Sequence, residues 1–187
     1  MLPELADKVT LYEVLHRIDV DLSEQARAAG CPCGGPLHRA SWVRKPRGGP
    51  ELPKAYAVRL GLCCGDCRRR TLPRSTLFFG RRVYWGVVVV VVMGLRQGGG
   101  QWGMRRLQRL LGMSLSTLRR WAAWFREVFP NSIRWKRLRG RLAGWLDPLR
   151  LPTALLERFS AHLDSEASVA ACLRFLASNP PPGEHTR

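Results

Sequence analysis

Two groups of closely spaced cysteines are the residues of this chain whose type and spacing predict chemistry. The first group is Cys-Pro-Cys-Gly-Gly at residues 31–35, and the second is Cys-Cys-Gly-Asp-Cys-Arg-Arg-Arg at residues 63–70. Two pairs of thiolates on two tight turns can hold a tetrahedral zinc ion. The pattern predicts a zinc ribbon with one structural zinc, and its predicted ligands are Cys31, Cys33, Cys64 and Cys67.

The first pair is narrower than the second, so the ligand set has alternatives. One residue separates Cys31 from Cys33, whereas two residues separate the cysteines of the second pair. Cys63 is an alternative ligand to Cys64, and His38 is a substitute for the narrow pair. Buried free thiols, or disulfides in a secreted protein, are the plainer interpretations of the six cysteines.

The N-terminal residues favour reduced thiols. The first ten residues carry Glu4, Asp7 and Lys8 and lack the apolar stretch of a secretory signal. We therefore expect a cytoplasmic chain whose thiols stay reduced. The longest apolar run, residues 83–95, is too short to span a bilayer and is followed by Arg96, so we expect no membrane partner.

Basic charge is concentrated in the middle of the chain. The 31 Lys and Arg residues exceed the 14 Asp and Glu residues, which gives a formal net charge of +17. Residues 31–130 carry nineteen basic side chains against three acidic ones, whereas residues 1–30 carry three against six. Arg predominates, and its guanidinium binds phosphate through paired hydrogen bonds and reads guanine edges. This balance predicts a nucleic acid partner, with a merely solvated basic surface as the alternative.

Residues 104–121 have the pattern of two short helices joined by a tight turn. Apolar residues recur at three- and four-residue spacing from Leu118 to Phe129. Gly112 permits a left-handed backbone at the end of the first helix, and Ser114 can cap the second. The pattern predicts a helix-turn-helix whose second helix enters the major groove of double-stranded DNA. An ordinary helical hairpin with a basic surface is the alternative.

The predicted DNA contacts come from several segments. We expect Arg119 and Arg120, on the second helix, to contact bases or phosphates. Further contacts are expected from the start of that helix, from the helix before it, from the loop at residues 45–50 and from the second cysteine turn. These residues are Ser114, Ser116, Thr117, Arg105, Arg106, Lys45, Arg47, Arg68, Arg69 and Arg70.

The elements that position these residues predict an α+β fold that is mainly helical. Strands are expected at residues 37–43 and 56–62. One or two amphipathic helices are expected at residues 10–29, with Leu11, Val14, Leu15 and Ile18 on one face. Helices are also expected at residues 135–145, 152–163 and 165–177, with Ser165 as the cap of the last one. For the six consecutive valines at residues 87–92, periodicity does not decide between a core strand and a buried helix.

This organisation divides the chain into five segments. They are an N-terminal helical segment at 1–30, a zinc ribbon at 31–80, a helix-turn-helix unit at 81–130, C-terminal basic and amphipathic helices at 131–178, and a disordered tail at 179–187.

These stretches resemble the N-terminal region of insertion-sequence transposases, in which a zinc ribbon precedes a helix-turn-helix. The matching stretches are residues 31–35, 64–70, 78–85 and 111–121, and the resemblance covers residues 31–126. It implies that the valine run forms the first helix of the DNA-binding unit. The chain departs from the family in its shortened first cysteine pair and in having no catalytic domain after the helix-turn-helix.

The residues after Phe129 do not provide a nuclease centre. Two-metal cleavage of DNA requires several converging carboxylates, and no Ser, Cys or Tyr nucleophile stands out. The acidic residues there are scattered over expected helices and the tail, and they are Asp147, Glu157, Asp164, Glu166 and Glu184. We therefore expect a binding protein and not an enzyme.

The sequence as a whole favours a zinc-containing protein that binds double-stranded DNA and is associated with a mobile element. An RNA-binding or ribosome-associated zinc protein is one alternative, because it would use the same basic charge. The others are a non-catalytic subunit of a transposase complex, with a separate transposase or recombinase subunit as partner, and a structural adaptor. A homodimer is left open.

Overall fold

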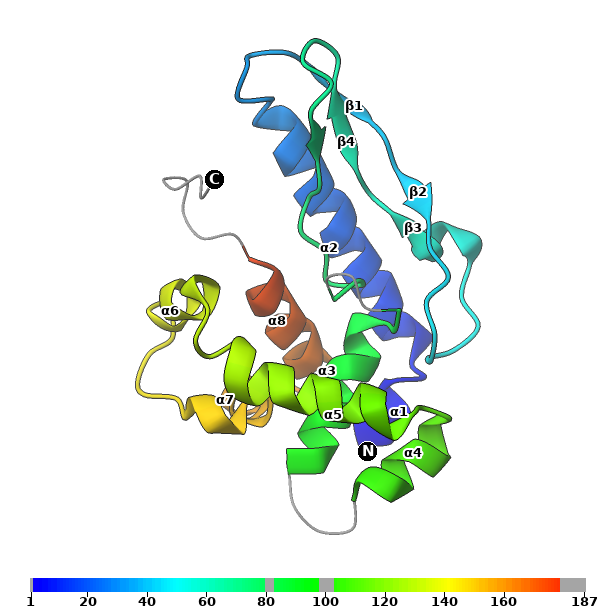
Figure 1. Cartoon of the computed structure of the whole chain (residues 1–187), viewed down its shortest axis with the longest axis vertical. Helices are drawn as coiled ribbons and strands as arrows, with labels where there is room; N and C mark the ends of the chain where they lie inside the picture. Colours follow the sequence, from blue (N-terminus) through cyan, green and yellow to red (C-terminus); the bar gives the residue numbers. More distant parts are fainter. Residues whose placement is uncertain (1, 80–82, 98–102, 179–187) are drawn as a thin grey trace.

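The computed structural model describes residues 2–79, 83–97 and 103–178, and it confirms a mainly helical α+β fold (Figure 1). Helices α1 (Leu2–Leu5) and α2 (Val9–Ala28) precede the strands β1 (Leu37–Arg39), β2 (Trp42–Val43), β3 (Val58–Arg59), β4 (Leu62–Cys64) and β5 (Arg70–Thr71), with a 3-10 helix η1 (Lys54–Ala57) before β3. Then follow α3 (Gly86–Gln97), α4 (Met104–Leu111), α5 (Leu115–Ala123), the π-helical η2 (Trp124–Val128), α6 (Ile133–Arg139), the 3-10 helix η3 (Pro148–Arg150), α7 (Thr153–Ser160) and α8 (Ser165–Ala177). The tail predicted at 179–187 lies outside the described residues.

Helix α2 joins the helical body to the strands. Its 20 residues make a rod about 30 Å long, and the strands run alongside it (Figure 1). Leu11 and Leu15 are buried, as the amphipathic pattern predicts. Val14 was expected on the same face but is 44% exposed, because the buried face is centred between Tyr12 and Leu15.

Asp19 fastens α2 to the segment that precedes α3. This residue is 3% exposed. Its carboxylate accepts hydrogen bonds from the Ser75 hydroxyl, from the Thr76 backbone N–H at 2.5 Å and from the Thr76 hydroxyl at 2.7 Å. Burial raises the pKa of Asp19, while these hydrogen bonds and the charge of Arg59 act in the opposite direction.

The strands form two small antiparallel sheets. One sheet has the order β1-β4-β5, and the other pairs β2 with β3. Both ranges predicted as strands, 37–43 and 56–62, contain strands, but neither is a single strand. The first divides into β1 and β2, and the second begins as the 3-10 helix η1 before β3 and β4. Beside the break between β1 and β2, the Trp42 ring packs against Gly61. A Cβ at position 61 would lie 2.7 Å from this ring.

Helix α3 is the centre of the hydrophobic core. All six valines from Val87 to Val92 are at most 1% exposed, and α3 packs against α1, α5, α7 and α8. The valine run is therefore a helix, while its role as the first helix of a DNA-binding unit stays a prediction. Burial on every side outweighs the strand preference of valine, because a helix surrounded by other helices satisfies its own backbone hydrogen bonds.

Helices α4 and α5 form the predicted pair. Gly112 adopts the left-handed conformation at the end of α4, with φ 59°. The Ser114 hydroxyl accepts a hydrogen bond from the Thr117 backbone N–H at 3.2 Å and caps α5. Met113 and Leu118 are buried between the helices and the core. The apolar stripe of α5 continues through η2 and the residue after it, and Trp121, Phe125 and Phe129 are also buried.

The C-terminal helices close the core. Helix α6 ends at Arg139, before Gly140, so the helix expected over 135–145 is shorter than predicted. Helix α8 has the predicted bounds, but Asp164 caps it instead of Ser165, because the Asp164 carboxylate accepts the Ala167 N–H at 2.8 Å. Lys8 pairs with Glu166 of α8 and so connects the two ends of the fold. Within residues 2–79, 83–97 and 103–178, every helix is too short or too polar to cross a bilayer.

Candidate metal centre and nucleic-acid interface

Four cysteines converge where the two predicted turns meet. The sulfur atoms of Cys31, Cys33, Cys64 and Cys67 all lie within 4.8 Å of one another. The Sγ atoms of Cys31 and Cys67 are 3.6 Å apart, and those of Cys33 and Cys64 are 3.5 Å apart. These distances are too long for disulfides. They fit a tetrahedral ion, since metal–sulfur bonds of ~2.3 Å give sulfur–sulfur edges of about 3.8 Å. The cluster therefore offers a complete four-thiolate site for a metal ion.

Two tight turns bring the sulfurs together. In the first, the Gly34 N–H donates to the Cys31 carbonyl at 2.8 Å, and Gly34 has φ 87°. Gly35 comes next and lies against the second turn. A Cβ at position 35 would come within 2.8 Å of the Cys64 sulfur. In the second turn, the Cys64 N–H donates to the Arg69 carbonyl at 3.0 Å. Glycine at position 35 thus permits the narrow first pair to reach the second.

The electrostatics of the cluster favour a cation. A backbone hydrogen bond from Gly35 and the neighbouring thiols lower the pKa of Cys33 to about 7. At Cys31 a backbone hydrogen bond from Cys33 lowers the pKa, but burial and the other thiols outweigh it and raise the pKa to about 12. Four adjacent thiolates repel one another. A bound metal ion would supply the positive charge that lets all four ionise together.

The two alternative ligands lie outside the cluster. Cys63 and His38 are paired across β4 and β1, and successive side chains of a strand point to opposite faces. Both therefore face away from Cys64 and Leu37, which are buried on the other side. The Cys63 thiol instead donates to the Arg68 carbonyl at 3.4 Å.

The metal cluster has a small hydrophobic core of its own. Among the described residues, this second core contains Cys31, Leu37, Leu62 and Cys64, and it is separate from the main core around α3. Glu24 of α2 adds a surface ion pair to Arg39 of β1 at 2.9 Å. So few apolar side chains leave the tip of the ribbon dependent on another source of stability.

The predicted DNA contacts occupy different parts of the molecule. Arg68, Arg69 and Arg70 are exposed at the turn that leads into β5, beside the cysteines. This tip and α4 lie at opposite ends of the long axis (Figure 1). Lys45 and Arg47 are exposed on a loop near the start of α3. The Arg47 N–H holds this loop in place by donating a hydrogen bond of 2.7 Å to the Val83 carbonyl. The structure therefore does not gather all of these residues into one patch.

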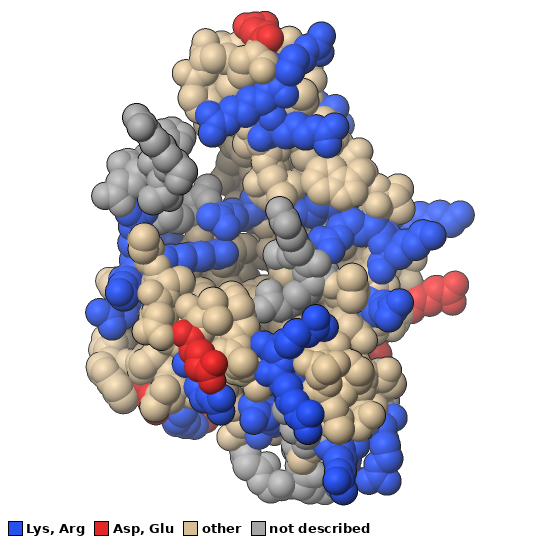
Figure 2. Space-filling model, in the orientation of Figure 1, with Lys and Arg blue, Asp and Glu red and all other residues tan. Residues whose placement is uncertain are grey.

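Helices α4 and α5 gather the remaining predicted contacts. Ser114, Ser116, Arg119 and Arg120 are exposed, on the side of α5 opposite its buried stripe. Arg105 and Arg106 are exposed on α4. Thr117 is only 9% exposed, and its hydroxyl accepts hydrogen bonds from Ser114 and from the Arg120 guanidinium. Thr117 therefore positions Arg120. Figure 2 shows basic side chains over α5 and few acidic ones on this face.

A pocket between the ribbon and the helices is a site that sequence reasoning missed. Its charged lining is Arg44, Arg59, Arg74 and Arg134. No sequence pattern indicated this pocket, because the four arginines are far apart in the chain and only the tertiary fold brings them together.

Comparison with known proteins adds no relative to this description. The chain matches no family model, no curated protein and no solved structure.

Proposed function

We propose that the protein is a zinc-containing, helix-turn-helix DNA-binding protein without catalytic activity of its own. The observation that carries this proposal is the exposed face of α5, where Ser116, Arg119 and Arg120 lie opposite the buried Leu118 and Trp121. In a helix-turn-helix the second helix lies in the major groove with such a face toward the base edges. The net charge of +17 supports a polyanionic partner.

Zinc is the metal that we propose for the four-cysteine cluster. Tetrahedral sites of four sulfurs select zinc or iron, and a site built only to hold two turns together needs no redox chemistry. Bound zinc would hold the tip of the ribbon as a rigid flank, with Arg68, Arg69 and Arg70 beside it. Such a site requires reduced thiols, which supports a cytoplasmic location.

The α5 face and the ribbon suggest two separate contacts with one DNA molecule. Arg119 and Arg120 would contact the major groove, and the arginines at the ribbon tip would contact phosphates farther along the duplex. We infer that the protein serves as the DNA-recognition part of a mobile-element system, acting with a separate transposase or recombinase subunit. A copurifying subunit with a carboxylate nuclease centre would support that partnership.

Quantitative binding tests the DNA-reading proposal. The metal-analysed protein would be titrated with duplex DNA, single-stranded DNA and folded RNA over a salt series, and a random duplex library would be selected for a motif. We expect one zinc per chain, a preference for duplex DNA and a selected motif. Preference for RNA would favour the RNA-binding alternative, and salt-sensitive binding without any motif would contradict groove reading.

A matched pair of double variants separates base reading from total charge. Arg119→Ala/Arg120→Ala removes two charges from α5, and Arg17→Ala/Arg174→Ala removes two exposed charges from α2 and α8. If both α5 arginines contact bases, the first variant should lose roughly 10-fold or more in affinity for the selected site, since each bidentate contact discriminates by about 1–3 kcal/mol. The second should keep its selectivity. Equal selectivity in both variants would contradict the assignment.

A further inference from the structure

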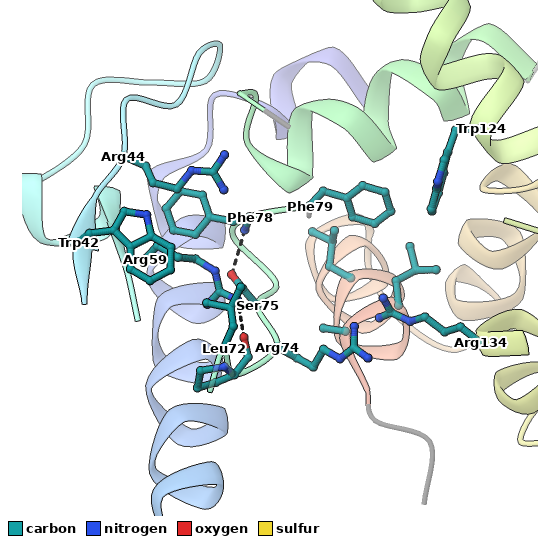
Figure 3. Close-up of a pocket in the computed structure, with 14 residues that line it drawn as sticks. Trp42, Arg44, Arg59, Leu72, Arg74, Ser75, Phe78, Phe79, Trp124 and Arg134 are labelled. Atoms are coloured by element: carbon teal, nitrogen blue, oxygen red, sulfur yellow. Dashed lines mark hydrogen bonds between the residues drawn. The ribbon is translucent and has the colours of Figure 1, made fainter. Parts of the chain in front are cut away.

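A pocket of about 590 Å³ opens between the ribbon and the helical body (Figure 3). One wall comes from β2, β3 and the segment at 72–79, and the opposite wall comes from η2, α6 and α8. Figure 2 shows the hollow on the same face of the molecule as α5, with basic side chains around it. The volume is in the range of pockets that bind small organic ligands.

Two of the four arginines in this pocket are engaged within the fold. Arg59 is 6% exposed. Its guanidinium donates hydrogen bonds to backbone carbonyls, among them that of Pro73, and the charge of the buried Asp19 acts on it. The Arg44 guanidinium lies over the Phe78 ring, 5.1 Å from the ring centre. These two side chains therefore belong to the wall of the pocket, and a ligand would depend on the other two arginines.

The other two arginines, Arg74 and Arg134, face each other. Their guanidinium groups point toward each other from different walls (Figure 3). The buried Nε of Arg134 has no hydrogen-bond partner among the described residues, and no Asp or Glu is among the described residues that line the pocket. A buried donor without an acceptor is costly. An oxyanion between the two groups would accept hydrogen bonds from both of them.

The electrostatics of Arg134 agree with this geometry. Burial lowers the pKa of Arg134 to about 10, and the charge of Arg74 acts in the same direction. Both effects disfavour the charged form of the guanidinium in the empty pocket. A bound anion would offset the desolvation of Arg134 and its repulsion from Arg74.

The rest of the pocket is apolar. Apart from Ser75, the remaining side chains that line it in the described part of the chain are aliphatic or aromatic. The helical wall includes Leu173, Leu176 and Ala177 of α8, which are at most 4% exposed. The Trp124 ring is stacked on the Phe129 ring, with the ring centres 4.8 Å apart, and meets the Phe79 ring edge-on. Trp124 is therefore a fixed part of the wall and not a stacking platform.

We infer that this pocket binds a small organic anion that has one carboxylate or phosphate head and an apolar body. The head lies between Arg74 and Arg134, and the apolar body packs against the side chains of α8. An inorganic ion would leave the apolar lining uncovered, and an uncharged molecule would leave the two guanidinium groups without an anion. The inference goes beyond the proposed DNA binding and does not depend on it, because none of the pocket residues lies on the exposed face of α5.

Calorimetric titration of the full-length protein tests the two halves of this ligand. The probes are hexanoate and hexyl phosphate, with acetate and inorganic phosphate as heads alone and 1-hexanol as the body alone. We expect one hexanoate or hexyl phosphate per chain, bound at least roughly 50-fold more tightly than the corresponding head, since each buried methylene contributes about fourfold in affinity. 1-Hexanol should bind at least roughly 10-fold more weakly than the better anion. The tighter of the two anions identifies the head as carboxylate or phosphate.

Three single variants locate the binding. Arg74→Gln, at an exposed position, and Arg134→Gln should each weaken the better anion at least roughly 10-fold, because each removes a charged hydrogen-bond donor. Arg17→Gln removes the same charge from an exposed position on α2, outside the pocket, and should leave the affinity unchanged. Arg74→Gln keeps the inference testable if Arg134→Gln does not fold.

Three results would overturn the inference. They are an equal loss of affinity in Arg17→Gln, which would show attraction to the net charge alone, binding of 1-hexanol as tight as that of the anions, and no advantage of hexanoate and hexyl phosphate over acetate and inorganic phosphate. Each of them leaves the DNA-binding proposal standing, because selectivity for a duplex motif is measured separately.

Discussion

Loss of the metal should unfold the tip of the ribbon and spare the helical body. In the part of the chain that the structure describes, the separate core of the tip contains two buried leucines, Leu37 and Leu62, besides two cysteines. Full burial of two leucine side chains contributes about 3–6 kcal/mol, whereas structural zinc contributes about 10–16 kcal/mol in small zinc modules. The metal is therefore the larger source of stability at the tip. Among the described residues, the main core around α3 shares no buried side chain with the core of the tip.

The matched variants for this prediction are Cys67→Ser and Cys63→Ser. Cys67 belongs to the sulfur cluster, whereas Cys63 is in the same turn region but outside it. We expect Cys67→Ser to lose zinc and its β4 amides to exchange hydrogen at least roughly 100-fold faster, which corresponds to about 3 kcal/mol of local stability. Amides of α3 should keep their protection, and Cys63→Ser should resemble the wild type. Retained stoichiometric zinc in Cys67→Ser, or zinc loss without faster exchange at the tip, would refute the reasoning.

Three further predictions concern single residues. Asp19→Asn should lower the unfolding free energy in urea by about 1–3 kcal/mol, because the buried carboxylate accepts hydrogen bonds from Ser75 and Thr76. Burial raises the pKa of Asp19 above its ordinary value of 3.8. The stability that this shift contributes to the fold is therefore fully present below pH 3.8 and is lost as the pH rises. A stability advantage of the wild type over Asp19→Asn that grows from about pH 3 to about pH 7 would contradict this. Gly35→Ala should weaken zinc binding at least roughly 10-fold in a chelator competition, since its Cβ would lie 2.8 Å from a ligand sulfur, and an unchanged affinity would count against the close approach. Gly112→Ala should lower the unfolding free energy by about 1 kcal/mol, and Gly112→Asn should lower it less. A Cβ at position 112 meets no atom within 4 Å, so the cost comes from the left-handed backbone alone. Equal stability of the wild type and both variants would disprove that cause.

Local chemistry made much of this structure predictable. Cysteine spacing identified the four sulfurs that meet, although the narrow first pair left Cys63 and His38 as alternatives until strand pairing placed them on the other face. Gly112 and Ser114 marked the turn between α4 and α5, because a left-handed glycine and a capping hydroxyl act within a few residues. The DNA-contacting role of α5 stays a prediction.

Features set by tertiary packing were not predictable in the same way. The valine run has strand propensity, and only its position among other helices makes α3. Asp164 caps α8 in place of Ser165. Both residue types can cap a helix, and which of two neighbours does so depends on the residue at which the helix begins, which the sequence does not fix to one position. The pocket arginines Arg59 and Arg134 are separated by 75 positions in the sequence, and no local pattern indicates that they meet.

The central position of α3 also has a consequence for synthesis on the ribosome. Its valines are covered partly by α8, whose last residue follows the end of α3 by 80 positions. At ~5–20 residues per second, α3 is made about 4–16 s before its cover is complete. A stretch of consecutive valines that waits uncovered is prone to pair with the same stretch of another nascent chain. Chains arrested before α7 should therefore aggregate or bind chaperones, whereas released full-length chains should not.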